Sequence, residues 1–338
     1  MRSTEPSGSS SQGTSAGGNS LLSQQNEHRL SFISPSSDVD PFRHESLRRA
    51  TVDIAVRNEA IKTLGTLNNM EEISAAYFKS THTRLPIIST RRFYERLPTL
   101  FSTAPADFMT LCLCIHLVQE TPPTNIGSML SSLYVTVKGI ISLLEATNYS
   151  SLDVVQSRLI VTFYEMGHGI YPTASISIGA CARLARSLKS NVARFEIEPS
   201  DIEVEERNRV RWAVFNLDRF ISLCNADTVF GIEDPASSDA LPIEDAVWAQ
   251  NVIPPTSPAT PVLATPSDIT VGQFARECQV SHLAGRVIRH VFDPTSDGEF
   301  QTKESLQLER TLLAFRPVLV EEELHYGKYC AALGICIW

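Results

Sequence analysis

Cys112, Cys114 and His116 form a closely spaced set of side chains that could ligate a metal. They alternate along an apolar segment, and on a helix residues two apart point to different sides. A metal ion needs ligands that converge on one point. We therefore predict that the two thiols are buried in the core as free cysteines and that no metal binds here.

Glu165 and His168 have the Glu-x-x-His spacing of carboxylate metal sites. A working site of that kind needs further ligands from neighbouring helices, so we expect a capping or surface pair instead. The sequence also lacks a Gly-x-Ser-x-Gly motif, a phosphate-binding loop and a complete dinucleotide fingerprint. It therefore predicts a protein that is not an enzyme and that binds no cofactor.

The composition is that of a globular protein kept in a reducing compartment. The 338 residues are 43% hydrophobic, which is enough for a sizeable core, and the seven cysteines are scattered. A formal charge of −9 and an isoelectric point near 5.4 are unlike those of a DNA-binding domain. No leader is visible, and the longest apolar run is too short to span a bilayer. We expect a soluble, intracellular protein without a membrane partner.

The clearest helical pattern runs from Pro199 to Cys224. Ser200 followed by Glu203 is a capping box, and acidic residues crowd the first turns, where the helix dipole favours them. Glu203 with Arg207, and Glu205 with Arg209, lie four residues apart and can pair on the helix surface. We expect this first half of the helix to be solvated.

The second half of that helix is apolar on nearly every side, which predicts burial with Trp212 and Phe215 in the core. Buried charges need partners, so we expect Arg211, Asp218 and Arg219 each to pair with a group on another helix. Asp218 and Arg219 are neighbours and are not expected to face each other. These charges either connect helices or link a cavity or partner surface to the bundle.

This helix resembles the signature helix in the middle homology region of fungal zinc-cluster transcription factors. The family motif reads approximately Glu-x-x-Arg-Arg-x-Trp-Trp, then Asp-Arg, then Ser. The matching residues here are Glu206, Arg209, Arg211, Trp212, Asp218, Arg219 and Ser222. The Gly-Arg-Pro that usually follows is absent, and the chain continues as Asn-Ala-Asp-Thr-Val-Phe-Gly over residues 225–231.

A second stretch resembles the start of the same family region. It contains Tyr77-Phe78, His82, Leu85-Pro86-Ile87 and Phe93 in the family's order. The resemblance implies a nuclear transcription regulator, often of one metabolic pathway or secondary-metabolite gene cluster. It also implies other transcription regulators, a homodimer partner or a small-molecule effector as binding partners. The motif residues are then structural or regulatory rather than catalytic.

The family's DNA-reading module is a binuclear zinc cluster, which requires six closely spaced thiolates. The sequence contains no Cys-x-x-Cys pair. We therefore expect zinc only if a cluster exists outside this chain, and we expect the chain to contact DNA only indirectly or through such a module.

The sequence predicts an all-α fold: a multi-helix regulatory bundle over residues 46–338 after a disordered polar tail, residues 1–45. A proline-rich loop at 253–266 interrupts the bundle. The predicted helices span residues 46–69, 70–79, 105–120, 128–147, 152–167, 171–187, 199–224, 267–291 and 303–326.

The last ten residues, 329–338, are apolar up to the terminus, whereas exposed ends are usually polar. We interpret this as a chain shorter than its relatives at both ends. Three alternatives to a regulator remain: a helical scaffold or inhibitor that pairs with full-length regulators through 333–338, a truncated remnant, or a helical enzyme with an unrecognised site.

Overall fold

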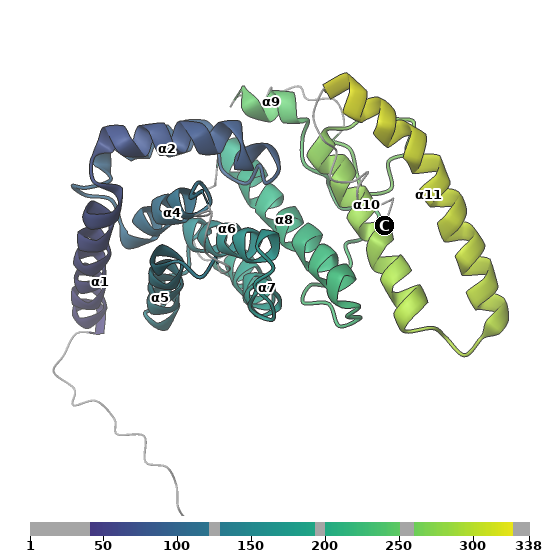
Figure 1. Ribbon diagram of the computed structural model, residues 1–338, viewed down its shortest axis with the longest axis horizontal. Helices are drawn as coiled ribbons and strands as arrows, with labels where there is room; N and C mark the ends of the chain where they lie inside the picture. The colour runs from purple at the N-terminus through teal and green to yellow at the C-terminus, as the bar shows by residue number, and fades with distance from the viewer. Residues whose placement is uncertain (1–40, 122–128, 193–199, 251–259, 327–338) are drawn as a thin grey trace, which may run out of the picture. The chain divides into compact units, whose positions relative to one another are not determined.

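The computed structural model describes residues 41–121, 129–192, 200–250 and 260–326, and the named elements in these ranges are all helices, joined by loops (Figure 1). The prediction of an all-α fold is therefore confirmed. The α-helices are α1 (Pro41–Leu64), α2 (Leu67–Lys79), α3 (Thr90–Arg96), α4 (Ala106–Leu117), α5 (Ser132–Ala146), α6 (Leu152–Gly167), α7 (Thr173–Val192), α8 (Asp201–Asn225), α9 (Asp245–Ala249), α10 (Gln273–Phe292) and α11 (Gly298–Tyr326). Two 3₁₀ turns, η1 (Thr81–Thr83) and η2 (Leu97–Thr99), flank α3.

Serine side chains begin several of these helices. Ser200 accepts a hydrogen bond from the Glu203 amide at the start of α8, as the capping box predicted. Ser89 caps α3 and Ser151 caps α6 in the same way. The short helices α3 and α9 were not predicted, because neither is long enough to display an apolar period. At the N-terminal end, α1 already begins at Pro41, so the last residues of the predicted tail 1–45 are helical.

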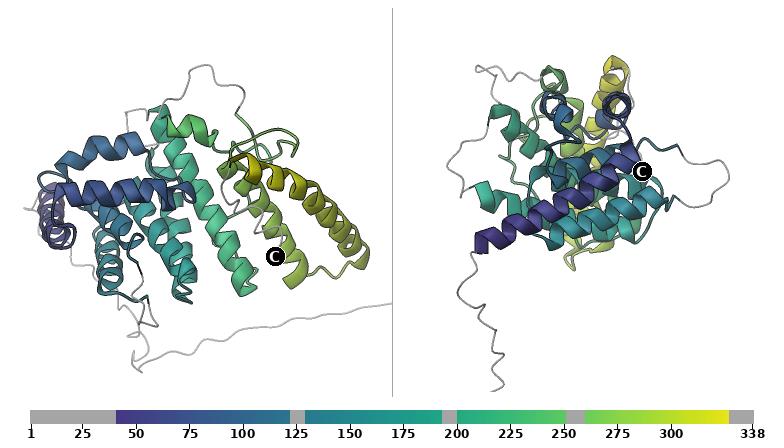
Figure 2. Two further views of the ribbon diagram at one scale, coloured as in Figure 1. Left: turned by 45° about the horizontal axis from the view of Figure 1, so that its top comes forward. Right: turned by 90° about the vertical axis from the view of Figure 1, so that its left-hand side faces the viewer.

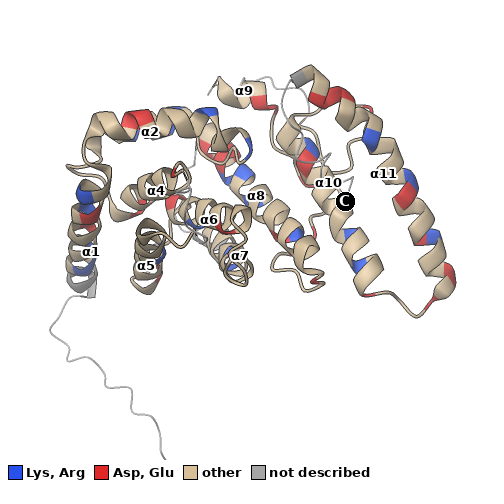
Figure 3. Ribbon diagram, viewed as in Figure 1, with Lys and Arg blue, Asp and Glu red and all other residues tan. Residues whose placement is uncertain are grey.

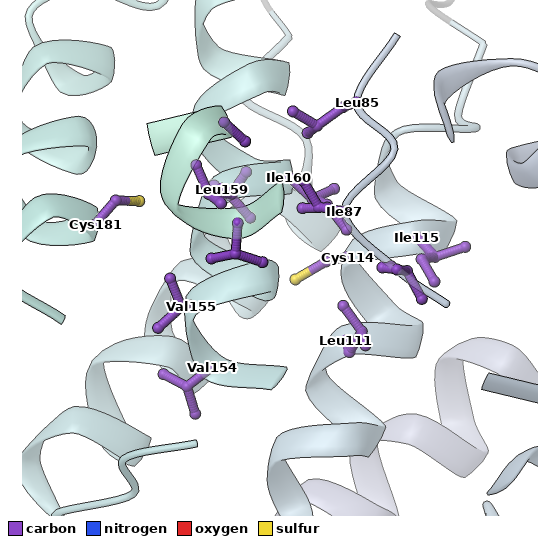
Figure 4. Close-up of a cluster of buried hydrophobic side chains, with 14 of the residues drawn as sticks. Leu85, Ile87, Leu111, Cys114, Ile115, Val154, Val155, Leu159, Ile160 and Cys181 are labelled. Carbon is purple, nitrogen blue, oxygen red and sulfur yellow. The ribbon is translucent and has the colours of Figure 1, made fainter. Parts of the chain in front are cut away.

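Two apolar helices, α4 and α6, form the centre of the core together with the segment before α3. Figure 4 shows Leu111 and Cys114 of α4 facing Val155 and Leu159 of α6. Cys112 and Cys114 are fully buried free thiols, so the prediction of core cysteines is confirmed. Burial raises the pKa of Cys114 to about 12, which keeps this thiol protonated and unreactive.

The helix α8 lies between two groups of helices, as Figures 1 and 2 show. On one side it packs against α6 and α7, and on the other against α10, which in turn packs against α11. This position explains why α8 carries apolar residues on most of its circumference. The prediction that the Trp212 to Arg219 segment lies inside a helical bundle is confirmed.

An ordered loop follows α8 and returns along it. Leu241 donates a backbone hydrogen bond to Pro261, and Leu263 donates one to Asp239, so two non-helical segments pair side by side. Residues 260–266 are therefore non-helical, as their prolines predict, whereas 251–259 fall outside the described residues. The tail up to residue 40 and the apolar run 329–338 also lie outside them. In the part that the structure covers, no helix combines the length and apolarity needed to cross a bilayer.

Candidate functional site

Glu206 connects the first half of α8 to the beginning of α3. Its Oε1 accepts hydrogen bonds from the Ser89 amide at 2.8 Å and from Gln156 Nε2 at 3.2 Å, and its Oε2 pairs with Arg92. Burial raises the pKa of Glu206, although the Arg92 charge and the Ser89 amide oppose that effect. One carboxylate thus connects three segments that are far apart in the sequence.

Arg209 is fully buried and receives polar contacts all around its guanidinium. Nε donates to Glu205 at 2.8 Å, Nη1 donates to Asp245 at 3.0 Å, and Nη2 donates to the Ile243 carbonyl at 2.7 Å. The guanidinium also lies 4.7 Å from the ring centre of Trp248 in α9. The predicted Glu205–Arg209 pair is confirmed, and it additionally fixes the segment that leads into α9.

Trp212 and Arg211 hold the end of the ordered loop against α8. The Trp212 indole N–H donates to the Ala240 carbonyl at 2.9 Å, and Arg211 Nη1 pairs with Asp239 at 2.9 Å. Trp212 meets Phe215 edge to face, with ring centres 5.6 Å apart. Both aromatic rings are buried, as predicted.

Asp218 and Arg219 bind the beginning of the same loop. Asp218 Oδ1 accepts the Gly231 amide at 3.0 Å, while Arg219 Nη2 donates to the Ile232 carbonyl at 3.0 Å and to Asp234 at 2.8 Å. A Cβ on Gly231 would lie 3.0 Å from Asp218 Oδ1, so the backbone approaches this carboxylate more closely than a side chain easily allows.

The prediction that Asp218 and Arg219 do not face each other is wrong, because Arg219 Nη1 donates to Asp218 Oδ2 at 2.5 Å. Both side chains contact the same short segment, Gly231 to Asp234, and this shared contact brings their polar ends together. Burial raises the pKa of Asp218, with the Arg219 charge opposing it. Burial also lowers the pKa of Arg219.

Asp234 links this loop to α10. It pairs with both Arg219 and Arg289. Partial burial acts to raise the pKa of Asp234, but its hydrogen bonds with the two guanidinium groups outweigh that effect and lower it. Both arginines also lie over the ring of Phe230, at 3.8 Å and 4.6 Å from its centre. Asp234 is therefore a fixed negative charge between α8 and α10.

Two further predictions for α8 need correction. Arg211 and Arg219 pair with acids in the loop 231–240 and not with groups on another helix, because the loop returns directly over them. The first half of α8 is not solvated on every side, since Glu205 and Glu206 are buried against the rest of the bundle. Figure 3 shows acidic and basic positions interspersed along α8, α10 and α11, in keeping with these pairings.

A cavity of about 400 Å³ lies beside this network, between α7, α8 and the loop 232–239. Apolar side chains form much of its lining, including Leu152, Ala185, Ile232 and Pro235. The lining also includes three arginines from α7 and α8, namely Arg186, Arg207 and Arg211. The volume lies in the range of small-molecule sites, which are typically about 300–1,000 Å³.

The two sets of candidate metal ligands have other structural roles. Glu165 is fully buried and accepts from Tyr134 OH and Lys138 Nζ, each at 2.8 Å, so the expected capping or surface pair with His168 is wrong. The same spacing recurs at Glu322 and His325, where Glu322 pairs instead with Arg276 of α10. Among the residues the structure describes, no group of three His, Cys, Asp or Glu side chains could hold a metal.

The chain matches the fungal specific transcription factor domain over residues 75–254, more than half of its length. This match begins at the Tyr77-Phe78 stretch and contains the whole of α8. The chain belongs to this family. The matched region of the fungal specific transcription factor domain thus includes both stretches singled out in the sequence, together with the loop that α8 binds.

Two curated relatives of this domain are transcription factors. Transcription factor BOA15 of Botryotinia fuckeliana (strain B05.10) is 34% identical over 122 residues, covering 36% of this chain and 68% of the relative. Transcription factor tazR of Aspergillus terreus (strain NIH 2624 / FGSC A1156) is 28% identical over 166 residues, covering 46% of this chain and only 26% of the relative. No solved structure matches the chain.

The acids that complete the α8 network were not singled out from the sequence. Each of these acids pairs with an arginine of α8. Asp234 and Asp239 lie in the loop after α8, and Asp245 lies at the start of the five-residue helix α9. The sequence offers six acids between residues 226 and 245, and spacing alone does not indicate which of them meet the arginines of α8. Nothing in local periodicity indicates that this loop folds back along the helix.

Proposed function

We propose that this chain is a pathway-specific regulator of transcription that acts in the nucleus through its helical domain. The observation that carries the proposal is the family match over residues 75–254 together with the buried network of α8 inside it. This network connects α3, α9, α10 and the loop 231–240 to one helix. A displacement of the loop therefore alters the contacts of several elements. The proposal requires no cofactor in this chain and is not an enzymatic one.

The proposed route to DNA is indirect. The formal charge of −9 disfavours attraction to phosphates, and the sequence has no Cys-x-x-Cys pair for a zinc cluster. We therefore assign the contacts with a promoter to other regulators, or to a module outside this chain. Incubation of the purified chain with promoter DNA should give no shift in electrophoretic mobility at physiological salt. A specific shift would contradict indirect action.

The regulatory role is tested by tethering. The chain, fused to an unrelated DNA-binding module, should change transcription of a reporter relative to the module alone. The Arg219→Ala fusion should lose this effect, because Asp218 and Asp234 would each lose their buried partner. The Arg183→Ala fusion is the matched control, since Arg183 is exposed on α7. Equal reporter output from the parent fusion and the bare module, at equal protein level, would contradict the proposal.

Pathway specificity is tested in the source organism. Deletion of the gene, followed by sequencing of total RNA, should change the transcripts of one small set of genes with a shared metabolic role. A fluorescent fusion of the chain should accumulate in the nucleus. Unchanged transcripts, or a change spread evenly over the genome, would contradict a pathway-specific role.

A second candidate function, pairing with another copy of this chain, is favoured by an apolar stripe on α11. Leu306, Leu313, Val320 and Leu324 recur at intervals of seven and four residues and are 47%, 58%, 43% and 79% exposed. In an antiparallel pair of α11 helices, Leu306 lies opposite the partner's Leu324. Arg310 and Glu321 are exposed next to the stripe, and in this register they come within one residue of facing each other, which supplies charge complementarity.

Sedimentation velocity tests this pairing. The wild-type chain should form a concentration-dependent dimer, and Arg310→Glu should abolish it by placing two acids together. The double variant Arg310→Glu with Glu321→Arg should restore the dimer, because the charges are exchanged and not removed. Leu143→Glu on α5 is the control, since Leu143 is also an exposed leucine. A wild-type chain that stays monomeric at high concentration would contradict pairing through α11.

A further inference from the structure

The cavity beside α8 has an apolar wall of the kind that holds a small organic molecule. Leu152, Ala185, Ile232 and Pro235 come from three different elements, and each remains partly exposed there. Trp212 and Phe215 back this wall and are themselves fixed by the hydrogen bond to Ala240 and by mutual edge-to-face packing. The wall is therefore preformed, which lowers the entropic cost of binding.

The side formed by α7 and α8 has an excess of positive charge. Arg186 donates only to a neutral acceptor, the Gly231 carbonyl, and no carboxylate in the described residues pairs with it. Arg207 pairs with Glu203, but the same carboxylate also lies 3.7 Å from Arg92. Arg92 already has Glu206 as its partner, so Glu203 balances Arg207, and the excess positive charge at this side of the cavity is that of Arg186.

A second observation at Arg207 points to a missing acceptor. Its Nε is buried and has no hydrogen-bond partner among the residues described. A buried N–H without an acceptor is costly, and such groups usually have a protein, water or ligand partner. Arg207 lines the cavity with Arg186, so a single anionic group placed there can serve both side chains.

The acids on the opposite side are mostly neutralised by protein groups. Asp239 pairs with Arg211, and Asp234 is held between Arg219 and Arg289. Glu233 is exposed at the rim of the loop. The charge of the cavity is therefore asymmetric: the excess positive charge lies towards α7 and α8, and the acidic rim lies on the loop.

We infer that this cavity binds a small organic anion, with an aromatic or other apolar body against Leu152, Ala185 and Ile232 and its carboxylate or sulfonate on Arg186 and Arg207. Such a ligand contacts α7, α8 and the loop 232–239 at once, so it stabilises the loop in its place against α8. The inference does not rest on the proposed role in transcription, because it concerns binding to the purified chain.

Two fluorescent probes of similar shape test the site. 8-Anilinonaphthalene-1-sulfonate has an aromatic body and one sulfonate, whereas N-phenyl-1-naphthylamine has the same body without the charge. The sulfonate probe should bind the folded chain at one site and about tenfold more tightly than the neutral probe, the difference expected for charge-assisted hydrogen bonds. Equal affinity for the two probes would overturn the assignment of the anion.

Four variants locate the bound probe. Arg186→Ala should weaken the sulfonate probe by about tenfold and leave the neutral probe unchanged, while Arg186→Lys should retain most of the affinity. Ala185→Leu fills the apolar wall and should weaken both probes. Arg183→Ala, an exposed arginine on the same helix, should change neither.

Two further measurements keep the result unambiguous. Leu313→Glu removes an exposed leucine from α11 and should leave probe binding unchanged, which separates the cavity from that apolar stripe. Urea unfolding midpoints of all variants report whether each is folded, and Arg186→Ala, an exposed substitution, carries the test if Ala185→Leu is unstable. Wild-type affinity for the sulfonate probe in folded Arg186→Ala would overturn the site, whatever the outcome of the reporter assay.

Discussion

Arg219 Nη1 donates a hydrogen bond to Oδ2 of Asp218 at 2.5 Å, although the two residues are neighbours on α8. The pair encloses the start of the loop, since Asp218 accepts the Gly231 amide and Arg219 donates to Ile232 and Asp234. The hydrogen bonds that this pair forms with the loop therefore exist only because the chain turns back towards α8 after that helix ends. The motif residues thus hold a long-range contact, and their removal is expected to affect stability before anything else.

The stem of Arg219 passes over Gly285 of α10, which leads to the first prediction. A Cβ at Gly285 would lie 2.8 Å from Arg219 Nε and 2.9 Å from its Cδ. Gly285→Ala should therefore destabilise the fold by about 1–3 kcal/mol through overpacking. Gly139→Ala on α5, where nothing lies within 4 Å, should instead stabilise it by about 0.5–1 kcal/mol. Urea unfolding measures both, and a stabilising Gly285→Ala would contradict the close packing of Arg219.

Glu206 provides the second prediction. Glu206→Gln keeps the shape but replaces one carboxylate oxygen by an N–H₂ group, which only donates. The glutamine can then accept from the Ser89 amide or from Arg92, but not from both. We expect a loss of about 1–3 kcal/mol in the free energy of unfolding. Glu203→Gln, on the same helix but partly exposed, should cost at most about 1 kcal/mol. Equal losses from the two substitutions would show that burial of Glu206 contributes little.

The third prediction concerns pH. Burial, followed by the nearby Asp245 carboxylate, raises the pKa of Glu277 from 4.5 to about 8, while Arg84 acts in the opposite direction. Between these values the folded chain keeps a proton that the unfolded chain has lost, so stability decreases as pH rises. Burial and then the Arg209 charge lower the pKa of His82 from 6.5 to about 3. Between about pH 3 and pH 6.5 the unfolded chain binds a proton at His82 that the folded chain does not, so stability increases with pH in this range.

The two groups oppose each other at mildly acidic pH, and only Glu277 of the two acts above the ordinary pKa of histidine. Glu277→Gln should therefore flatten the decrease in stability between neutral pH and pH 8. Glu71→Gln, on the exposed side of α2, serves as the control and should leave the slope of the wild type. Thermal unfolding midpoints across this pH range measure the slope. Identical slopes for Glu277→Gln and the wild type would refute the assignment.

Glu165 and His168 give the fourth prediction, because their sequence spacing suggests a pair and the structure separates them. Glu165→Gln disturbs the buried contacts with Tyr134 and Lys138 and should cost about 1–3 kcal/mol. His168→Ala, at the exposed end of α6, should change stability by no more than about 0.5 kcal/mol. Zinc titration should give the same heat for the wild type and both variants. A zinc-dependent stabilisation lost in both would restore the metal interpretation.

Most of the helices could be read from the sequence because their signals are local. The capping box at Ser200, the proline-rich break and the pairs that Glu203 and Glu205 form with arginines four residues later depend only on spacing along one segment. The short helices α3 and α9 could not be read in this way. Their formation depends on a Ser89 cap and on contacts with α8, and not on an apolar period of their own.

The candidate site divides in the same way. The sequence by itself determined that the chain is helical, that Trp212 and Phe215 are buried, and that the α8 charges need partners. Only the tertiary structure decided what those partners are: the Ser89 amide for Glu206, Asp239 for Arg211, and the returning loop for Asp218 and Arg219. The physical reason is that burial creates the demand for a partner at each residue. The residue that meets this demand is set by how distant segments pack, which no local pattern records.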